Sequence, residues 1–587
     1  MLEKMTKYVQ NNHQKFWLFI PFFLAFCCFI NTLGNGFLYD DIFLVVKAAP
    51  VFENWTLENI KLLFKTDMWD FATSQLDEEG RKQSLYYRPV LMLELMIIYA
   101  YAGLSSWKWH LSSVLLHAFA SMLTYQVINV SLEKTKIVTD KKQINRFSLF
   151  AAVVFAIHPV QSESVAWISA LGSSLVAIKM LVCMLFYLHI RDLPIKSKSF
   201  ISKLFLSLLI FFLALLTKEV AIVLLVLMLS YEVFLFQHKT LWNKDLLPIV
   251  VSAIAFLFVT FGYIVLRHLI IGNLDIKVLS PDFPEIDNLP FFVTLFTLPI
   301  VVISYLKILI YPFNLIPFYP IYHIYEPQLE NFYIPLLIVL MFTISSLWFA
   351  WNNKLIRLGL IWLVLPILPV LDIRLFLSEN LIHDRYLYFS LIGAGLFLCQ
   401  AVEWLNQWLS KKKVNQSPYL NQSLQPSLLI TTLMIFLVMG SLSIKQNYVW
   451  ENEWQFWSFI KEKFPNCCGA TVDLGRLFFN DKLYDEAISY YEEAKRICPN
   501  SLRVHSSLGV LYLRKGNFTE AENSIRRQME LALKPTTQVI ACLNLGIIYE
   551  LKGDKIQAID YYQKALKLDP NSQKAKELLN NLEKKNN

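Results

Sequence analysis

Glycine is scarce in this chain, and no glycine-rich loop of the kind that cradles nucleotide phosphates is present. Only 17 of the 587 residues are glycine, and they form none of the phosphate-binding motifs. The eight cysteines show no metal-ligand spacing, and charged residues make up only 17% of the chain. These shortages argue against a nucleotide-binding fold, a zinc module and a charge-covered soluble surface.

Apolar residues are abundant instead. They account for 55% of the chain and aromatic residues for 15%, and the mean hydropathy is +0.43. This composition is typical of a polytopic membrane protein. The net charge of +8 does not indicate nucleic acid as a partner, because the basic residues cluster in short loops between apolar segments. We therefore expect an all-α fold that contacts membrane lipids.

Hydrophobic windows predict about eleven membrane-spanning helices. We place them near 16–33, 108–130, 147–159, 173–190, 203–217, 219–237, 246–270, 332–351, 358–371, 386–407 and 427–445. The first is expected to be retained, since it lacks a small-residue cleavage site. Alternate loops are basic and belong on the cytoplasmic side, which puts the N-terminus inside and the C-terminus outside. An extra span at 291–313 would invert the later basic loops, so this segment is expected to be interfacial or re-entrant.

The chain changes character after Lys445. Leu-Gly pairs begin at Leu474, Leu508 and Leu545, close to the period of tetratricopeptide repeats. Each pair is followed by an aromatic and then a small residue, which suits closely packed helix pairs. The expected domains are a membrane domain with two outer loops, a linker, and three repeats plus a capping helix. Their ranges are 1–445 (outer loops 34–106 and 271–331), 446–466 and 467–587.

Polar residues from distant parts of the sequence fall on the outer face of this topology. Two adjacent carboxylates, Asp40 and Asp41, directly follow the first span. Like charges side by side at a membrane boundary are costly and tend to serve a function. The other candidate site residues are Tyr39, Arg88, His158, Glu163, Lys218, Glu219, His383, Asp384 and Arg385. Their shared face is what a site at the outer membrane surface requires.

Simpler interpretations exist for several of these residues. A lone arginine at a membrane boundary is commonly a snorkelling anchor, and Lys218 with Glu219 could form a local ion pair. His158 could be a helix-end histidine that bonds backbone groups. His110 and His117 are expected to be structural, because no histidine, cysteine or carboxylate nearby completes a metal site. No metal site is therefore predicted, and a need for a divalent cation is left open.

The outer residue set suits transfer of a sugar from a lipid-linked phosphate. Basic side chains bind such a phosphate and stabilise charge on the leaving group; Arg385 is the first choice, with Arg88 and Lys218 second. A carboxylate removes a proton from the acceptor hydroxyl, which attacks the anomeric carbon. Asp40 and Asp41 are equal candidates for this base.

The sequence resembles the TMTC family of transmembrane, tetratricopeptide-containing O-mannosyltransferases of the GT-C superfamily. The matching pieces are Tyr39-Asp40-Asp41, Tyr87-Arg88-Pro89, His110 to His117, Ala156 to Trp167 (AIHPVQSESVAW), Leu215 to Glu219, Asp384 to Tyr388, and Trp450 to Trp454. The resemblance implies a lipid-phosphate donor carrying mannose, a protein hydroxyl acceptor and inversion at the sugar.

Two departures from this family matter. The repeat array is short, which resembles the prokaryotic members. Leu171-Gly172-Ser173-Ser174 stands where the eukaryotic relatives carry a Gly-Arg-Ala-Asp-like sequence, so neither Arg nor Asp is available there.

The leading hypothesis is a multi-pass membrane enzyme that transfers sugar to Ser or Thr on the outer face, with the acceptor protein held by the repeats. It places the protein in a bacterial or archaeal cell membrane, or in the endoplasmic reticulum membrane if it is eukaryotic. Two alternatives remain: a transferase that uses the same donor but a lipid or glycan acceptor, and a non-enzymatic membrane scaffold.

Overall fold

The computed structural model describes residues 2–74, 84, 86–236, 246–272, 289–375, 381–413, 426–532 and 535–584. Within these ranges every regular element is helical, which confirms the all-α expectation. The chain divides into two compact units. The first comprises Met1–Ile276, Phe291–Ile373 and Ser378–Asn452, and the second comprises Lys277–Pro290, Arg374–Leu377 and Glu453–Asn587.

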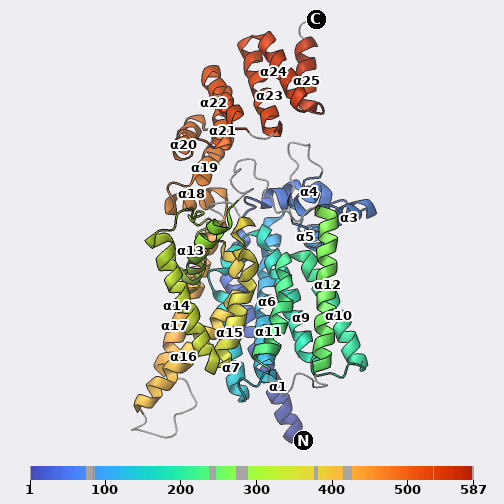
Figure 1. Cartoon of the computed structure of the whole chain (residues 1–587), viewed down its shortest axis with the longest axis vertical. Coiled ribbons are helices and arrows are strands. Elements are labelled where there is room, and N and C mark those ends of the chain that lie inside the picture. The colour runs from blue at the N-terminus through green and yellow to red at the C-terminus, as the bar shows by residue number, and fades with distance from the viewer. Residues whose placement is uncertain are drawn as a thin grey trace. The chain divides into compact units, whose positions relative to one another are not determined.

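The first unit is a bundle of long helices that run roughly alongside one another (Figure 1). They are α1 (Leu2–Phe29), α6 (Ser106–Lys134), α7 (Lys141–Ile157), α9 (Gly172–Ile190), α10 (Lys198–Thr217), α11 (Val223–Phe234), α12 (Leu247–Ile271), α13 (Phe291–Ile310), α14 (Ile334–Asn352), α15 (Lys354–Val364), α16 (Ser390–Lys413) and α17 (Pro426–Asn447). Among the described residues, nine helical segments are long and apolar enough to cross a membrane. The count of eleven spans stays a prediction: the nine include α13, which was not predicted to span, and do not include α7, α11 or α16, which correspond to the predicted spans 147–159, 219–237 and 386–407.

Short helices connect the long ones. They are η1 (Ile30–Gly34), η2 (Ile42–Lys47), α2 (Ala49–Phe52), α3 (Leu57–Leu63), α4 (Met68–Ala72), α5 (Pro89–Ala102), α8 (Gln161–Ala166), η3 (Ile168–Ala170), η4 (Glu219–Ile222), η7 (Leu329–Tyr333), η8 (Leu365–Leu371), η9 (Ile373–Leu375) and η10 (Asp384–Leu387). Most of the candidate residues lie on or next to these short elements.

α13 is long and apolar enough to be a span, and both of its ends contact other segments of the unit. Near its C-terminus the carbonyl oxygen of Leu309 lies 3.2 Å from Nε2 of His158, which ends α7. Near its N-terminus Phe296 packs on Phe332, with ring centroids 5.2 Å apart, just before α14 begins. Arg357, beyond the far end of α14, bonds the terminal carbonyl of α11. The interpretation of 291–313 as an interfacial or re-entrant segment stays a prediction.

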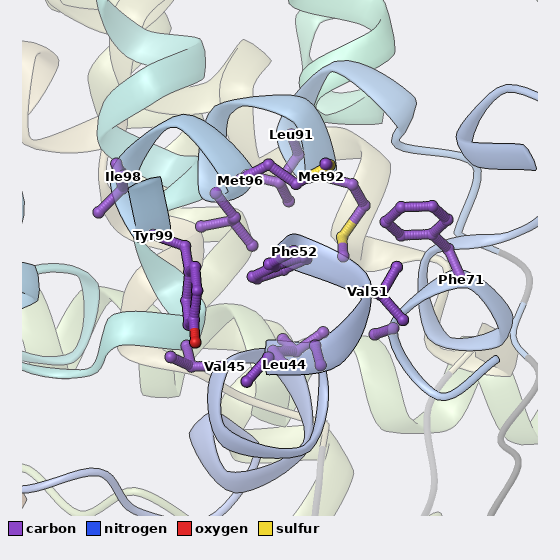
Figure 2. Close-up of a cluster of buried hydrophobic side chains, with 14 of the residues drawn as sticks. Leu44, Val45, Val51, Phe52, Phe71, Leu91, Met92, Met96, Ile98 and Tyr99 are labelled. Atoms are coloured by element: carbon purple, nitrogen blue, oxygen red, sulfur yellow. The ribbon is translucent and has the colours of Figure 1, made fainter. Parts of the chain in front are cut away.

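A buried apolar cluster fixes the first outer loop (Figure 2). Val45 of η2, Phe52 of α2 and Phe71 of α4 are fully buried and belong to one cluster with Met96 of α5. Burying a large apolar side chain contributes about 1.5–3 kcal/mol. The carboxylate pair therefore precedes a packed substructure rather than a solvated loop.

The second unit contains paired helices of the expected repeat pattern (Figure 1). They are α18 (Glu453–Lys463), α19 (Cys468–Asn480), α20 (Tyr484–Ile497), α21 (Leu502–Arg514), α22 (Phe518–Leu531), α23 (Pro535–Lys552), α24 (Lys555–Leu568) and α25 (Gln573–Lys584). α18 lies within the segment predicted as a linker. At Gly475 an added Cβ would lie 2.7 Å from the Tyr491 ring, so only glycine allows α19 and α20 to pack this closely. A disulfide joins Cys468 to Cys498 across this first pair, which the sequence did not predict.

Candidate functional site

The two adjacent carboxylates have different surroundings. Asp41 is 1% exposed. One of its oxygens accepts hydrogen bonds from the backbone N–H of Ser169 at 2.8 Å and from the Ser169 hydroxyl at 2.5 Å, and the other accepts from the N–H of Leu38 at 3.2 Å. Burial raises the pKa of Asp41 to about 7, against the opposing effect of these hydrogen bonds. Asp41 therefore ties η2 to η3 instead of facing an open site.

Asp40 is only half-buried. Its backbone carbonyl accepts hydrogen bonds from the N–H groups of Phe43 and Leu44 at the start of η2, which fixes the position of its Cα. The preceding residue, Tyr39, has φ +52°, a left-handed conformation that is uncommon outside glycine and concentrates at functional sites. Of the two carboxylates, Asp40 is the more exposed.

Glu163 and Arg385 form a buried ion pair between α8 and η10. Arg385 donates to Glu163 from its guanidinium at 2.5 Å and from its backbone N–H at 2.9 Å. Nδ1 of His383 lies 3.5 Å from the same carboxylate. Burial alone would raise the pKa of Glu163, but Arg385 and His383 outweigh it and lower the pKa to about 2. Glu163 is thus a fixed anion that orients the arginine.

A second cation pairs with its own carboxylate nearby. The Arg88 guanidinium donates to Glu219 through Nε and NH2, at 3.0 and 2.7 Å from Oε2. The adjacent Lys218 does not form the local ion pair that the sequence allowed; its Nζ donates to the Ser173 hydroxyl at 2.8 Å. Lys218 is close enough to both arginines for their charges to lower its pKa. The three predicted phosphate-binding residues therefore gather in one place.

Trp167 contacts Tyr39, Trp450 and Arg385 through its ring. Its ring lies 6.1 Å from that of Tyr39, between centroids, and it stacks on Trp450 at 5.6 Å. The guanidinium carbon of Arg385 lies 5.1 Å from the Trp167 ring centroid, within cation–π range. The indole Nε1 is buried with no hydrogen-bond partner among the described residues. Tyr39, next to the carboxylate pair, and Arg385 thus contact the same indole ring.

Asp384 lies beneath this cluster. It accepts a hydrogen bond from the Tyr319 hydroxyl at 2.7 Å, and burial together with the charge of Glu163 raises its pKa well above the ordinary value. The neighbouring Phe318 ring lies 6.1 Å from Tyr39 and 6.3 Å from His383. The segment between α13 and α14 therefore contacts both halves of the site.

His110, His117 and His158 each contact a backbone carbonyl group. His158 accepts from the N–H of Val160 at 3.3 Å, and its other ring nitrogen faces the Leu309 carbonyl. His117 lies between the Ala156 carbonyl and the Tyr388 hydroxyl. His110 lies 3.4 Å from the Gly36 carbonyl. The simpler, structural interpretation therefore describes all three.

Several residues of the cluster were not selected from the sequence. Ser169, Ser173, Tyr319 and Trp167 carry no charge, so nothing in their local pattern distinguishes them from packing residues. Arg267 faces Glu219 from the end of α12, and a lone arginine near the end of an apolar helix was the available signal for it. No group of three or more potential metal ligands occurs in the described ranges.

Comparisons with known proteins cover both units. Three tetratricopeptide-repeat models match residues 472–501, 504–539 and 539–572. The human protein O-mannosyl-transferase TMTC3 is 22% identical over 85% of this chain and 53% of its own length; its mouse counterpart is 24% identical over the same shares. The Drosophila melanogaster protein O-mannosyl-transferase Tmtc1 is 31% identical over 24% of this chain and 15% of its own length. The chain thus spans about half the length of the curated relatives it matches first.

Among solved structures, an archaeal oligosaccharyltransferase AglB from Archaeoglobus fulgidus, in complex with an inhibitory peptide and a dolichol-phosphate, has a TM-score of 0.41 at 11% identity. The match covers 94% of this chain and 72% of the oligosaccharyltransferase chain. The resemblance expected from the motifs is confirmed by the curated relatives, and residues 472–572 are tetratricopeptide repeats. The chain is a multi-helix membrane protein with C-terminal tetratricopeptide repeats, related over most of its length to the TMTC protein O-mannosyl-transferases.

Proposed function

We propose that this protein transfers a sugar, mannose in the first instance, from a polyprenyl or dolichyl phosphate to Ser or Thr hydroxyls of a polypeptide. The observation that carries the proposal is the Trp167 ring, which contacts both Tyr39, the residue before the carboxylate pair, and Arg385 of the basic cluster formed by Arg88, Lys218 and Arg385. A phosphate bound at the basic cluster has a carboxylate nearby to deprotonate an acceptor. The curated relatives, named as O-mannosyl-transferases, support the same class of reaction.

Asp40 is the general base in this mechanism. It takes the proton from the acceptor hydroxyl as the oxygen attacks the anomeric carbon, while the bond from that carbon to the phosphate oxygen breaks. The phosphate leaves with the bonding electrons and gains one negative charge, which the basic cluster stabilises. Asp41 is a positioning residue, because its two oxygens are occupied by Ser169 and Leu38.

The repeats bind the acceptor polypeptide, and we place them outside the cytoplasm. The disulfide between Cys468 and Cys498 supports this placement, because disulfides persist in oxidising compartments and are rare in the cytosol. Three stacked repeats suit a peptide segment. They also favour a protein over the alternative lipid or glycan acceptor, and the catalytic arrangement argues against a purely structural scaffold.

The test is a transfer assay with labelled polyprenyl-phosphate mannose and a panel of protein acceptors. The Asp40→Asn variant should lose roughly 10²-fold or more in turnover and still bind the donor. Asp192→Asn, a matched change at an exposed position beyond the far end of α9, should retain full turnover. Wild-type turnover in Asp40→Asn would refute the assigned role, and failure of the wild-type protein to use any lipid-phosphate sugar would refute the proposed function.

A further inference from the structure

Lys218 differs from the two arginines of the cluster in its partner. Arg88 and Arg385 each form an ion pair with a carboxylate, at 2.7 and 2.5 Å. Lys218 instead donates to the neutral hydroxyl of Ser173, and no carboxylate of the described residues lies within ion-pair distance of it. It lies at the end of α10 in extended conformation, with φ −160° and ψ 135°, so its side chain leaves the helix axis there.

The charges that face Lys218 come from four other positions. They are Arg88 before α5, Arg385 in η10, Glu219 in η4 and Glu163 in α8. Each of the two arginines is paired with one of the two glutamates, so of these five charges only the lysine ammonium has no ion-pair partner among the described residues. A sugar attached to a lipid phosphate is a phosphodiester with a single negative charge. Lys218 can therefore neutralise the donor without disrupting either arginine pair.

The protonation of Lys218 is also costly when no anion is present. Burial, followed by repulsion from Arg88 and Arg385, lowers the pKa of Lys218 to about 7, against a smaller opposing effect of Glu219 and Glu163. A phosphate within hydrogen-bond distance adds an opposite charge and favours the ammonium form. The empty and occupied sites thus prefer different protonation states of this one residue.

We propose that Lys218 is the residue that pairs with the donor phosphate, and that it takes up a proton from solvent when the donor binds. The two arginine pairs form a rigid frame around it, and Ser173 orients the amine in the empty site. This inference rests on the proposed function. During transfer the acceptor proton goes to Asp40, the bond between the anomeric carbon and the phosphate oxygen breaks, and the ammonium of Lys218 remains beside the phosphate as its charge increases.

The coupling predicts a specific pH dependence. Below about pH 6 Lys218 is already charged, so donor binding takes up little proton. At pH 8 most of the empty protein has a neutral amine, so binding takes up close to one proton. Above pH 7 the apparent donor affinity should fall by up to about tenfold for each pH unit.

Calorimetry of the full chain in detergent micelles can measure this uptake. The probe is a non-hydrolysable phosphonate analogue of polyprenyl-phosphate mannose, titrated at pH 6 and pH 8 in two buffers of different ionisation enthalpy. The wild type should take up close to one proton at pH 8. Lys218→Arg should bind at both pH values without uptake, because arginine stays protonated. Lys218→Met should lose affinity at pH 6 by roughly ten- to a hundredfold.

A matched control removes the same charge from the other end of α10. Lys203→Met should bind the analogue with wild-type affinity and wild-type proton uptake. Proton uptake that persists in Lys218→Arg would overturn the proposal while leaving donor binding, and hence the proposed function, intact. Wild-type affinity in Lys218→Met would do the same. No binding of the analogue by the wild-type protein would refute the proposed function itself.

Discussion

Replacing Asp41 by Asn should reverse its effect on stability between acidic and alkaline pH. The carboxyl is buried and its pKa is raised from 3.8 to about 7. A group whose folded-state pKa is raised contributes stability that is fully present below its unfolded pKa and lost as pH rises through its folded pKa. The window is therefore about pH 4 to 7. At about 1.36 kcal/mol for each pH unit, the wild type loses roughly 4 kcal/mol across it.

The Asn side chain does not titrate, so it removes this loss. It also carries an NH2 group where Asp41 has its second acceptor, and this group faces either the Leu38 N–H or the Ser169 donors. Leaving one such donor unpaired costs about 1–3 kcal/mol. The variant should therefore be less stable than the wild type at pH 4, where the penalty acts alone, and equally or more stable at pH 8.

Thermal unfolding of purified protein in detergent, followed by tryptophan fluorescence from pH 4 to 9, measures this difference. Asp140→Asn is the control, because Asp140 is exposed and caps α7 through its side-chain oxygens, and Asn is an equally good N-cap. Its curve should run parallel to that of the wild type. A constant difference between Asp41→Asn and the wild type at all pH values would refute the assignment of a raised pKa to Asp41.

Three further predictions concern the repeats and the topology. Reductant should destabilise the wild-type repeats by about 3–4 kcal/mol, because the disulfide closes a 30-residue loop. Limited proteolysis should show this sensitivity to reductant in Cys542→Ser, which keeps the disulfide, but not in Cys468→Ser, which lacks it. Equal protection of the wild type with and without reductant would contradict this prediction. In a background without reactive thiols, Tyr448→Cys should react with an impermeant thiol reagent in intact cells, and Lys196→Cys should not. Both positions are exposed, but they are predicted to lie on opposite faces of the membrane. The reverse labelling pattern would place the candidate site on the cytoplasmic face. Deleting 467–587 should impair transfer to a protein acceptor far more than transfer to a short Ser/Thr peptide, whereas equal losses would indicate that the repeats only stabilise the protein.

The repeat domain was the part of the fold most accessible from sequence. Leu-Gly pairs such as Leu474-Gly475 recur with a period that only a few architectures share, and each glycine meets a ring or side chain of the partner helix. The disulfide between Cys468 and Cys498 was missed, because the two cysteines are 30 positions apart at the ends of a helix hairpin, and these ends meet only after packing.

The helical class and the set of candidate polar residues at the helix ends followed from the sequence by itself, because hydropathy and loop charge report on each segment separately. The individual roles within that set did not. Asp40 and Asp41 are indistinguishable as neighbours in sequence, yet packing against η3 buries one and leaves the other half-exposed. Arg385 pairs with Glu163, which is 222 positions away in the sequence, and Lys218 donates a hydrogen bond to Ser173. Partners of this kind depend on which helix ends meet in space, so only the tertiary structure decided which charges are neutralised and which remains for a ligand.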